Sequence, residues 1–148
     1  MGKRTLTPEF REFLACLNRA NVEYLLVGGF AVNYYGYHRS TEDIDFWMAV
    51  SDQNFTQLLA AIRDFFGEDI PGLDRDFLKK NESLYLGSVP NKIEIFQKAS
   101  GLDFEQAYPR RVEAAIEGLP VKIIGLEDLK KNKGASGRTK DRADLEHL

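Results

Sequence analysis

The sequence feature that most constrains the fold is a run of β-favouring residues that ends at a pair of glycines. Residues 22–27 read VEYLLV, a nearly continuous apolar segment typical of strands that are buried on both faces. Gly28 and Gly29 end this run, and residues 30–35 then suit a short helix before Gly36. A buried strand that leads through two glycines into a helix predicts a sheet covered by helices, in an α/β or α+β domain.

Hydrophobic periodicity divides the rest of the chain into further elements. The pattern predicts helices over residues 8–20, 54–66, 104–111, 126–132 and 139–148, and strands over residues 43–48, 83–86, 92–96 and 121–124. Residues 67–81 predict a loop with a helical turn, and the strands at 83–86 and 92–96 flank a hairpin-like loop. Residues 134–137 (GASG) predict a break between the last two helices, and residues 112–116 receive no assignment.

Length and composition restrict the class of protein. A chain of 148 residues fits a single domain, and at this size it buries roughly 68–70% of the surface of its unfolded form, so its core needs no disulfide or structural metal. Cys16 is the only cysteine, which excludes an internal disulfide and leads us to expect a cytoplasmic protein. No apolar run approaches the ~20 residues of a membrane span. The net charge of −3 argues against a general nucleic-acid coat, although a local basic patch could still bind phosphate.

The two glycines also suit the binding of phosphate. Glycine lets the backbone approach a ligand closely, and the N-terminus of a helix presents unpaired N–H groups and the positive end of the helix dipole. Gly28 and Gly29 are therefore candidate phosphate-binding residues. A tight turn without any ligand explains the same dipeptide.

Asp43 and Asp45 stand two positions apart on a predicted strand, so both point to the same face. Ile44, Phe46 and Met48 mark the opposite face as core. Two adjacent carboxylates repel each other, and binding of Mg²⁺ through one or two carboxylates together with substrate phosphates is a reason for a fold to keep them. Alternatively, both carboxylates lie at the solvent-exposed start of the strand and bind no metal.

Glu94 is an acidic residue among apolar neighbours in the predicted strand at residues 92–96. If this strand lies at the edge of the sheet and Glu94 faces water, its acidic side chain needs no functional explanation. If this strand pairs beside the strand of Asp43 and Asp45, Glu94 completes a cluster of three carboxylates. Such a cluster could hold two metal ions about 3.5–4 Å apart and stabilise both the attacking and the leaving oxygen of a displacement.

Taken together, these motifs resemble the nucleotidyltransferase superfamily of the DNA polymerase β type. Residues 27–32 (VGGFAV), followed by Arg39-x-Thr41-x-Asp43-Ile44-Asp45-Phe46, look like its signature of a strand, two small residues, a helix and Asp-x-Asp, with a third carboxylate on a later strand. Residues 126–133 and 136–145 are similar to the ending of small bacterial and archaeal members, the minimal nucleotidyltransferases and the AbiE-type toxin–antitoxin relatives. The resemblance covers residues 22–148.

The resemblance implies a small mixed sheet flanked by helices and a metal-dependent transfer of a nucleoside monophosphate from an NTP to a hydroxyl, with release of pyrophosphate. Asp43 and Asp45 match the family's metal-binding acids, and Mg²⁺ or Mn²⁺ is the expected ion. Glu94 matches the third acid, which helps to bind metal and activates the acceptor hydroxyl, although the family more often has Asp there.

The acceptor stays open between a protein hydroxyl, the 3′ end of a tRNA and a small molecule such as an aminoglycoside. Binding to a membrane or to double-stranded DNA is not expected. Templated synthesis is not expected either, because the polymerase-type nucleic-acid-binding domains are absent. A role in a toxin–antitoxin system is a further implication of the resemblance. A relative that binds a nucleotide or a partner protein without turnover is the alternative function.

A basic run near the C-terminus offers candidate ligands for the triphosphate. Six cations lie within 13 positions: Lys130, Lys131, Lys133, Arg138, Lys140 and Arg142. A solvated helical face explains such a run equally well, whereas in a phosphate site Lys acts as a point charge and Arg as a bidentate donor. The family resemblance favours Lys133, Lys140 and Asp141 as nucleotide-binding residues, and Arg39 is a further candidate.

Overall fold

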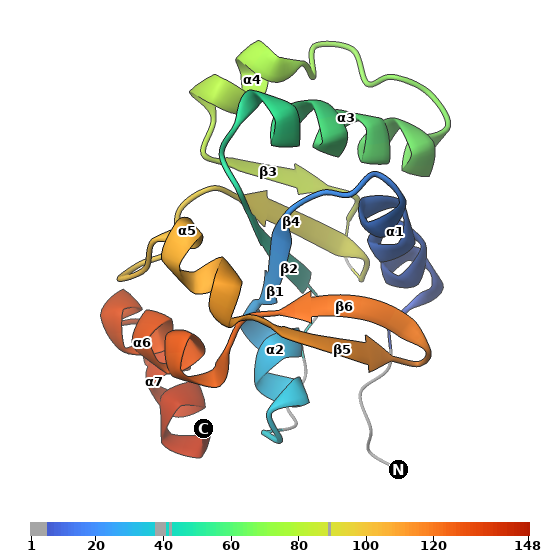
Figure 1. Ribbon diagram of the computed structural model, residues 1–148. Coiled ribbons are helices and arrows are strands. Elements are labelled where there is room, and N and C mark those ends of the chain that lie inside the picture. Colours follow the sequence, from blue (N-terminus) through green and yellow to red (C-terminus); the bar gives the residue numbers. More distant parts are fainter. Residues whose placement is uncertain (1–5, 38–40, 42, 89) are drawn as a thin grey trace.

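The computed structural model describes residues 6–37, 41, 43–88 and 90–148 (Figure 1). The strands are β1 (Tyr24–Val27), β2 (Asp43–Met48), β3 (Ser83–Leu86), β4 (Lys92–Phe96), β5 (Val112–Ile116) and β6 (Leu119–Ile123). The helices are α1 (Pro8–Arg19), α2 (Gly28–Tyr34), α3 (Asp52–Phe66), α4 (Arg75–Lys80), α5 (Phe104–Ala107), the 3₁₀ helix η1 (Tyr108–Arg110), α6 (Leu126–Ser136) and α7 (Thr139–His147).

All the strands of the described chain form a single mixed sheet in the order β3-β4-β2-β1-β6-β5. The pairs β1–β2, β3–β4 and β5–β6 are antiparallel, whereas β2–β4 and β1–β6 are parallel. The expected fold class, a small mixed sheet flanked by helices, is therefore confirmed. The parallel pairing of β2 and β4 matters most for function, because it brings two distant acidic segments side by side.

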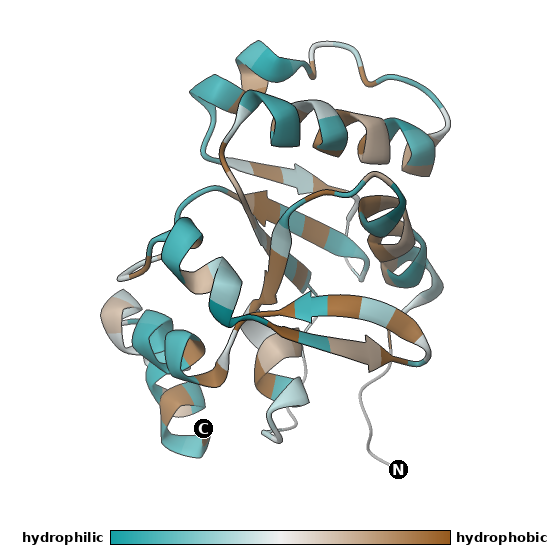
Figure 2. Ribbon diagram, in the orientation of Figure 1, coloured by the Kyte–Doolittle hydropathy of each residue, from teal (hydrophilic) through white to brown (hydrophobic). Residues whose placement is uncertain are grey.

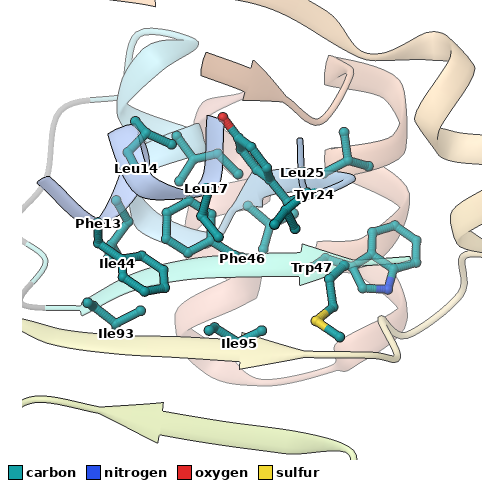
Figure 3. Close-up of a cluster of buried hydrophobic side chains, with 14 of the residues drawn as sticks. Phe13, Leu14, Leu17, Tyr24, Leu25, Ile44, Phe46, Trp47, Ile93 and Ile95 are labelled. Carbon is teal, nitrogen blue, oxygen red and sulfur yellow. The ribbon is translucent and has the colours of Figure 1, made fainter. Parts of the chain in front are cut away.

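The hydrophobic core lies between one face of the sheet and the helices α1 and α3. The alternate residues of the neighbouring strands β2 and β4 that point into it are Ile44, Phe46, Ile93 and Ile95 (Figure 3). The ring of Phe13 in α1 lies 5.9 Å from that of Phe46 and 5.3 Å from that of Phe65 in α3. Because side chains alternate along a strand, the residues between these apolar positions point to the opposite face.

Part of that opposite face is covered by the segment that contains α5 and η1. Trp47 is buried there, with its ring 5.1 Å from that of Phe104 and its indole N–H donating to the carbonyl of Gln97 at 3.1 Å. Arg110 of η1 forms two hydrogen bonds, of 3.0 and 2.9 Å, with the carboxylate of Asp128 in α6. This pairing fixes α6 beside the sheet face on which Asp43 and Asp45 lie.

The hairpin of β5 and β6 contains the segment that the sequence left unassigned. Residues 112–116 (VEAAI) pair with β6 over the whole length of the strand. The connecting residues Glu117 and Gly118 adopt φ values of 54° and 82°, as two-residue hairpin turns of type I′ require. The predicted strand at residues 121–124 overlaps β6, which begins two residues earlier and ends at Ile123.

Helix α6 differs from the prediction because it continues through Gly134 to Ser136. A Cβ at Gly134 would lie 3.7 Å from Leu145 Cδ2 of α7, so this turn of α6 faces its neighbour helix. Packing between the two helices offsets the roughly 1 kcal/mol that glycine costs in a helix interior. The helix ends instead at Gly137, which adopts the left-handed conformation with φ of 71°.

Apolar residues concentrate in the strands, whereas α6 and α7 are largely hydrophilic (Figure 2). No helix within the described ranges is long and apolar enough to cross a membrane.

Candidate active site

A cavity of about 490 Å³ opens on the sheet face opposite α1 and α3. Its walls come from the junction of β1 and α2, the first residues of β2, the strands β3 and β4, the loop after β4, and α6 with Arg138. Six of the predicted site residues line it together: Gly28, Gly29, Asp43, Asp45, Glu94 and Lys133.

The two acidic strands meet in register along one wall of this cavity. Strand β4 does pair beside β2, and Asp45 is the direct neighbour of Glu94 across the parallel ladder. Asp43 lies two residues before Asp45, opposite Lys92. The three carboxylates therefore share one face and one cavity, although residues 92–96 are separated from residues 43–48 by the whole of α3, α4 and β3.

The carboxylates of the cavity suit Mg²⁺ or Mn²⁺ held together with substrate phosphates. They do not suit a metal ion that protein side chains alone must bind. Among the described residues, no group of three or more Asp, Glu, His or Cys side chains is arranged to hold a metal ion by itself. Mg²⁺ is usually held by one or two carboxylates, with substrate phosphates and water filling the other positions. Asp43 and Asp45, on one face of the same cavity, fit that requirement.

Gly28 contacts the carboxylate of Asp45 so closely that no side chain fits between them. A Cβ at Gly28 would clash with Asp45 Oδ2 and would lie 2.9 Å from its Cγ. Gly28 also has φ of +68°, a conformation that glycine adopts at little cost. The dipeptide forms the first turn of the seven-residue helix α2 itself, rather than a loop before it.

Tyr85 of β3 contributes a hydroxyl that the sequence analysis did not identify. Its O–H donates to Glu94 Oε2 at 3.0 Å, and the ammonium of Lys92 lies 4.5 Å from the centre of its ring. The hydrogen bond to Glu94 raises the pKa of Tyr85, and the negative charges of Glu94, Asp45 and Asp43 add to that effect. The antiparallel register of β3 and β4, which places Tyr85 opposite Glu94, is the signal that identifies it.

Lys133 of α6 is buried and bound to two carboxylates of α7. Its Nζ lies 2.9 Å from Asp141 Oδ1 and 3.1 Å from Asp144 Oδ2, and both acids are 1% exposed. Asp141 also accepts hydrogen bonds from the hydroxyl of Ser136 and from Arg138 Nε, the latter at 2.7 Å. Asp141 thus lies behind the cavity wall and fixes the two cations, Lys133 and Arg138, that line it.

This network determines the charge of Asp141. Burial alone would raise the pKa of its carboxyl group, but hydrogen bonds from Ser136, Lys133 and Arg138 outweigh that effect and lower the pKa to about 2. Asp141 is therefore ionised at neutral pH and compensates the buried charge of Lys133.

The basic run does not form one surface. Lys133 is buried, Arg138 has a side chain that is 73% exposed at the cavity, and Lys131 and Arg142 are exposed outside the cavity lining. Lys98, from the loop after β4, also lines the cavity and pairs with Glu82 at 2.9 Å. Lys140 belongs to α7, but its side chain, like the whole of Arg39, lies outside the described residues.

A comparison with protein families identifies the chain's relatives. The family model described as "Nucleotidyltransferase of unknown function (DUF6036)" matches residues 5–148. A search of curated proteins found no match.

Solved structures of low sequence identity share the fold. The solution structure of the antibiotic-resistance factor ANT(2″)-Ia has a TM-score of 0.58 at 17% identity, covering 93% of this chain and 79% of that one. The same factor in complex with adenylyl-2″-tobramycin gives 0.50 at 16% identity, with 91% and 82% covered. The Thermotoga maritima protein TM1012, described as a candidate nucleotidyltransferase, gives 0.57 at 12% identity, with 93% and 88% covered.

An antigenic nucleotidyltransferase-like protein from Paracoccidioides brasiliensis has a TM-score of 0.56 at 17% identity, with 97% of this chain and 75% of that one covered. These likenesses agree with the mixed sheet and its flanking helices. The family match over nearly the whole sequence shows that this chain belongs to the DUF6036 family of the nucleotidyltransferase superfamily.

Proposed function

We propose that this protein transfers a nucleoside monophosphate from an NTP to a hydroxyl acceptor, with release of pyrophosphate, in the cavity described above. The observation that carries the proposal is the direct pairing of Asp45 with Glu94 on the wall of a cavity whose other side presents Lys133 and Arg138. Carboxylates on one side and cations on the other suit a metal-bound polyphosphate. Family membership supports nucleotidyl transfer as the reaction class.

Asp43 and Asp45 would hold Mg²⁺ or Mn²⁺ together with the phosphates of the NTP. Bound there, a divalent ion would supply stabilisation of the negative charge on the attacking and leaving oxygens of an in-line displacement. The contact of Gly28 with Asp45 supports this role, because it fixes the second carboxylate against the backbone at the start of α2.

Glu94 would accept the proton of the acceptor hydroxyl. A general base must lie within hydrogen-bonding reach of the proton that it removes. Glu94 Oε2 already accepts a hydrogen bond from a hydroxyl group, that of Tyr85, so the carboxylate is accessible to such a donor. This arrangement favours Glu94 as the base over Glu94 as a principal metal ligand.

Lys133, Arg138 and the backbone at Gly28 and Gly29 would bind the triphosphate. An ammonium group has three hydrogen-bond donors and a guanidinium has five, so each cation has donors beyond those that Asp141 and Asp144 accept. Lys140 and Arg39 remain candidates for the same task, and Asp141 would act indirectly, by positioning the two cations.

The proposed reaction requires that the acceptor carry a hydroxyl group. A hydroxyl of a protein, of a tRNA 3′ end or of an aminoglycoside-like molecule fits the proposed reaction, and the complex of ANT(2″)-Ia holds adenylyl-2″-tobramycin. We propose that the protein is a single cytoplasmic domain and that it acts in a toxin–antitoxin system.

The test uses the purified protein, a bacterial cell lysate, Mn²⁺ and each α-labelled NTP in turn. We expect the wild type to incorporate label into a lysate component, and Asp45→Asn to incorporate none. Nucleotide binding without incorporation in every lysate tested would instead support a binding module of the same fold. Asp76→Asn, in α4 and outside the cavity lining, is the matched control and should behave as the wild type.

A further inference from the structure

We propose that Tyr85 is itself an acceptor, so that the protein attaches a nucleoside monophosphate to its own phenolic oxygen. This inference rests on the proposed function and names one acceptor for it. The site is formed by residues of the adjacent strands β3 and β4, and its chemistry is that of a phenol beside a general base.

The hydroxyl of Tyr85 is already hydrogen-bonded to the proposed general base. It donates to Glu94 Oε2 at 3.0 Å, within the roughly 2.6–3.2 Å reach that a base needs for the proton it abstracts. Glu94 lies between Tyr85 of β3 and Asp45 of β2 in the sheet. Tyr85 is therefore two strands away from the candidate metal ligands, whereas Glu94 is one strand away. An incoming acceptor hydroxyl would have to compete with Tyr85 for Glu94.

Tyr85 is also accessible. The residue is 54% exposed, and β3 lies at one edge of the sheet (Figure 1). Ser83, two residues earlier and therefore on the same face, lines the cavity. The ring can thus move toward a bound NTP by rotation of its side chain, without a change in the strand.

Other tyrosines are engaged in different ways. Tyr24 is buried and donates to Asn18 at 2.9 Å, while Tyr35 donates to the carbonyl of Ile124 at 2.7 Å. Tyr37 is stacked on His147 with ring centres 3.9 Å apart. Tyr34 is 42% exposed on α2 and packs edge-on against Tyr35. Tyr34 therefore offers an accessible phenol for comparison with Tyr85.

The reaction balances without any further reactant than the NTP. A bond forms between Tyr85 Oη and the α-phosphorus, and the bond from this phosphorus to the oxygen that bridges it to the β-phosphorus breaks. The electron pair of the broken bond leaves with the pyrophosphate, and the phenolic proton passes to Glu94. The product is a tyrosyl phosphodiester beside Glu94, where it would exclude a second acceptor from this carboxylate.

The test measures the intact mass of the full-length purified protein before and after incubation with Mg²⁺ or Mn²⁺ and each NTP. We expect one nucleoside monophosphate per chain, located on Tyr85 by fragmentation, with release of an equal amount of pyrophosphate. The modification should be absent from Tyr85→Phe and retained in Tyr34→Phe. Protein that already carries the group at Tyr85 as isolated from cells supports the inference equally.

Two outcomes would overturn the inference and leave the proposed function intact. Either the wild type labels a lysate acceptor while its own mass stays unchanged, or Tyr85→Phe gains the same mass as the wild type. Failure of the proposed function gives a different result, because neither the lysate nor the protein then acquires label. Since Tyr85→Phe removes only an exposed hydroxyl, we expect its unfolding midpoint to match that of the wild type, which the same preparation can confirm.

Discussion

Gly28 and Asp45 are in direct contact at the junction of β1, α2 and β2, with the carboxylate of Asp45 in the space that a Cβ at Gly28 would occupy. This contact links the end of the buried strand to the acidic strand. The orientation of a candidate metal ligand therefore depends on the absence of a side chain at another residue.

We expect Gly28→Ala to reduce both stability and nucleotidyl transfer. The substitution forces a left-handed conformation on alanine, at about 1–2 kcal/mol, and pushes the Asp45 carboxylate away from its position. Denaturant unfolding and the transfer rate measure the two effects.

Gly118→Ala is the matched control for Gly28→Ala. Gly118 has φ of +82°, but no atom lies within 4 Å of its Cβ position, so alanine there experiences the backbone strain alone. It should lose stability and keep full transfer activity. If both variants lost stability equally and both remained fully active, the contact of Gly28 with Asp45 would have no functional role.

Three strands that line the candidate site were predicted with their observed bounds. Residues 43–48, 83–86 and 92–96 alternate apolar and polar side chains, and that pattern depends only on local sequence. The hairpin strand at residues 112–116 was not predicted, because Glu113, Ala114 and Ala115 have no preference for strands. Its conformation comes from pairing with β6 across the turn at Glu117 and Gly118.

The roles of Tyr85 and Lys133 required the three-dimensional structure. Tyr85 acquires a function only through the register that sets it opposite Glu94. Lys133 reads as one member of a basic run, but the packing of α6 against α7 buries it between Asp141 and Asp144. Spacing along the sequence could not separate this buried lysine from its exposed neighbour Lys131.

Divalent metal should stabilise the wild-type protein by mass action. A ligand that binds only the folded state adds RT ln(1 + [L]/Kd), about 2.7 kcal/mol at one hundred times Kd. We expect Mn²⁺ to raise the thermal unfolding midpoint of the wild type and of Asp76→Asn, and to leave that of Asp45→Asn nearly unchanged. An equal shift in all three proteins would mean that the metal binds elsewhere.

Removal of Lys133 should destabilise the fold strongly. Lys133→Ala removes the buried ammonium that is bonded to the carboxylates of Asp141 and Asp144, and the loss of one partner from a buried ion pair costs about 3–5 kcal/mol. Lys131→Ala, at an exposed position two residues away in the same helix, should change the free energy of unfolding by less than about 0.5 kcal/mol. Similar values for the two variants in denaturant titrations would contradict the structural role of the ion pairs.

Acid should weaken the link between α6 and α7 over a defined range. The folded-state pKa of Asp141 is lowered from 3.8 to about 2, so its ionised form contributes stability at pH values above 3.8. That contribution is lost as the pH falls from 3.8 through about 2, where the carboxyl group becomes protonated in the folded state as well.

Denaturant titrations across this range compare the wild type with Asp141→Asn. The variant should be less stable at neutral pH, and its free energy of unfolding should fall less steeply than that of the wild type between pH 4 and pH 2. Parallel curves for the two proteins would show that Asp141 does not titrate in this way.

A paired measurement on Asp43→Ala tests the central claim most directly, namely that the acids of β2 carry out nucleotidyl transfer and do not merely bind nucleotide. The two quantities are the affinity for NTP without metal, by calorimetry, and the rate of transfer at saturating NTP with Mg²⁺ or Mn²⁺. The account predicts that transfer is abolished while the metal-free affinity stays the same or rises, because a carboxylate that repels the phosphates has been removed. Transfer by Asp43→Ala at the wild-type rate would contradict the account.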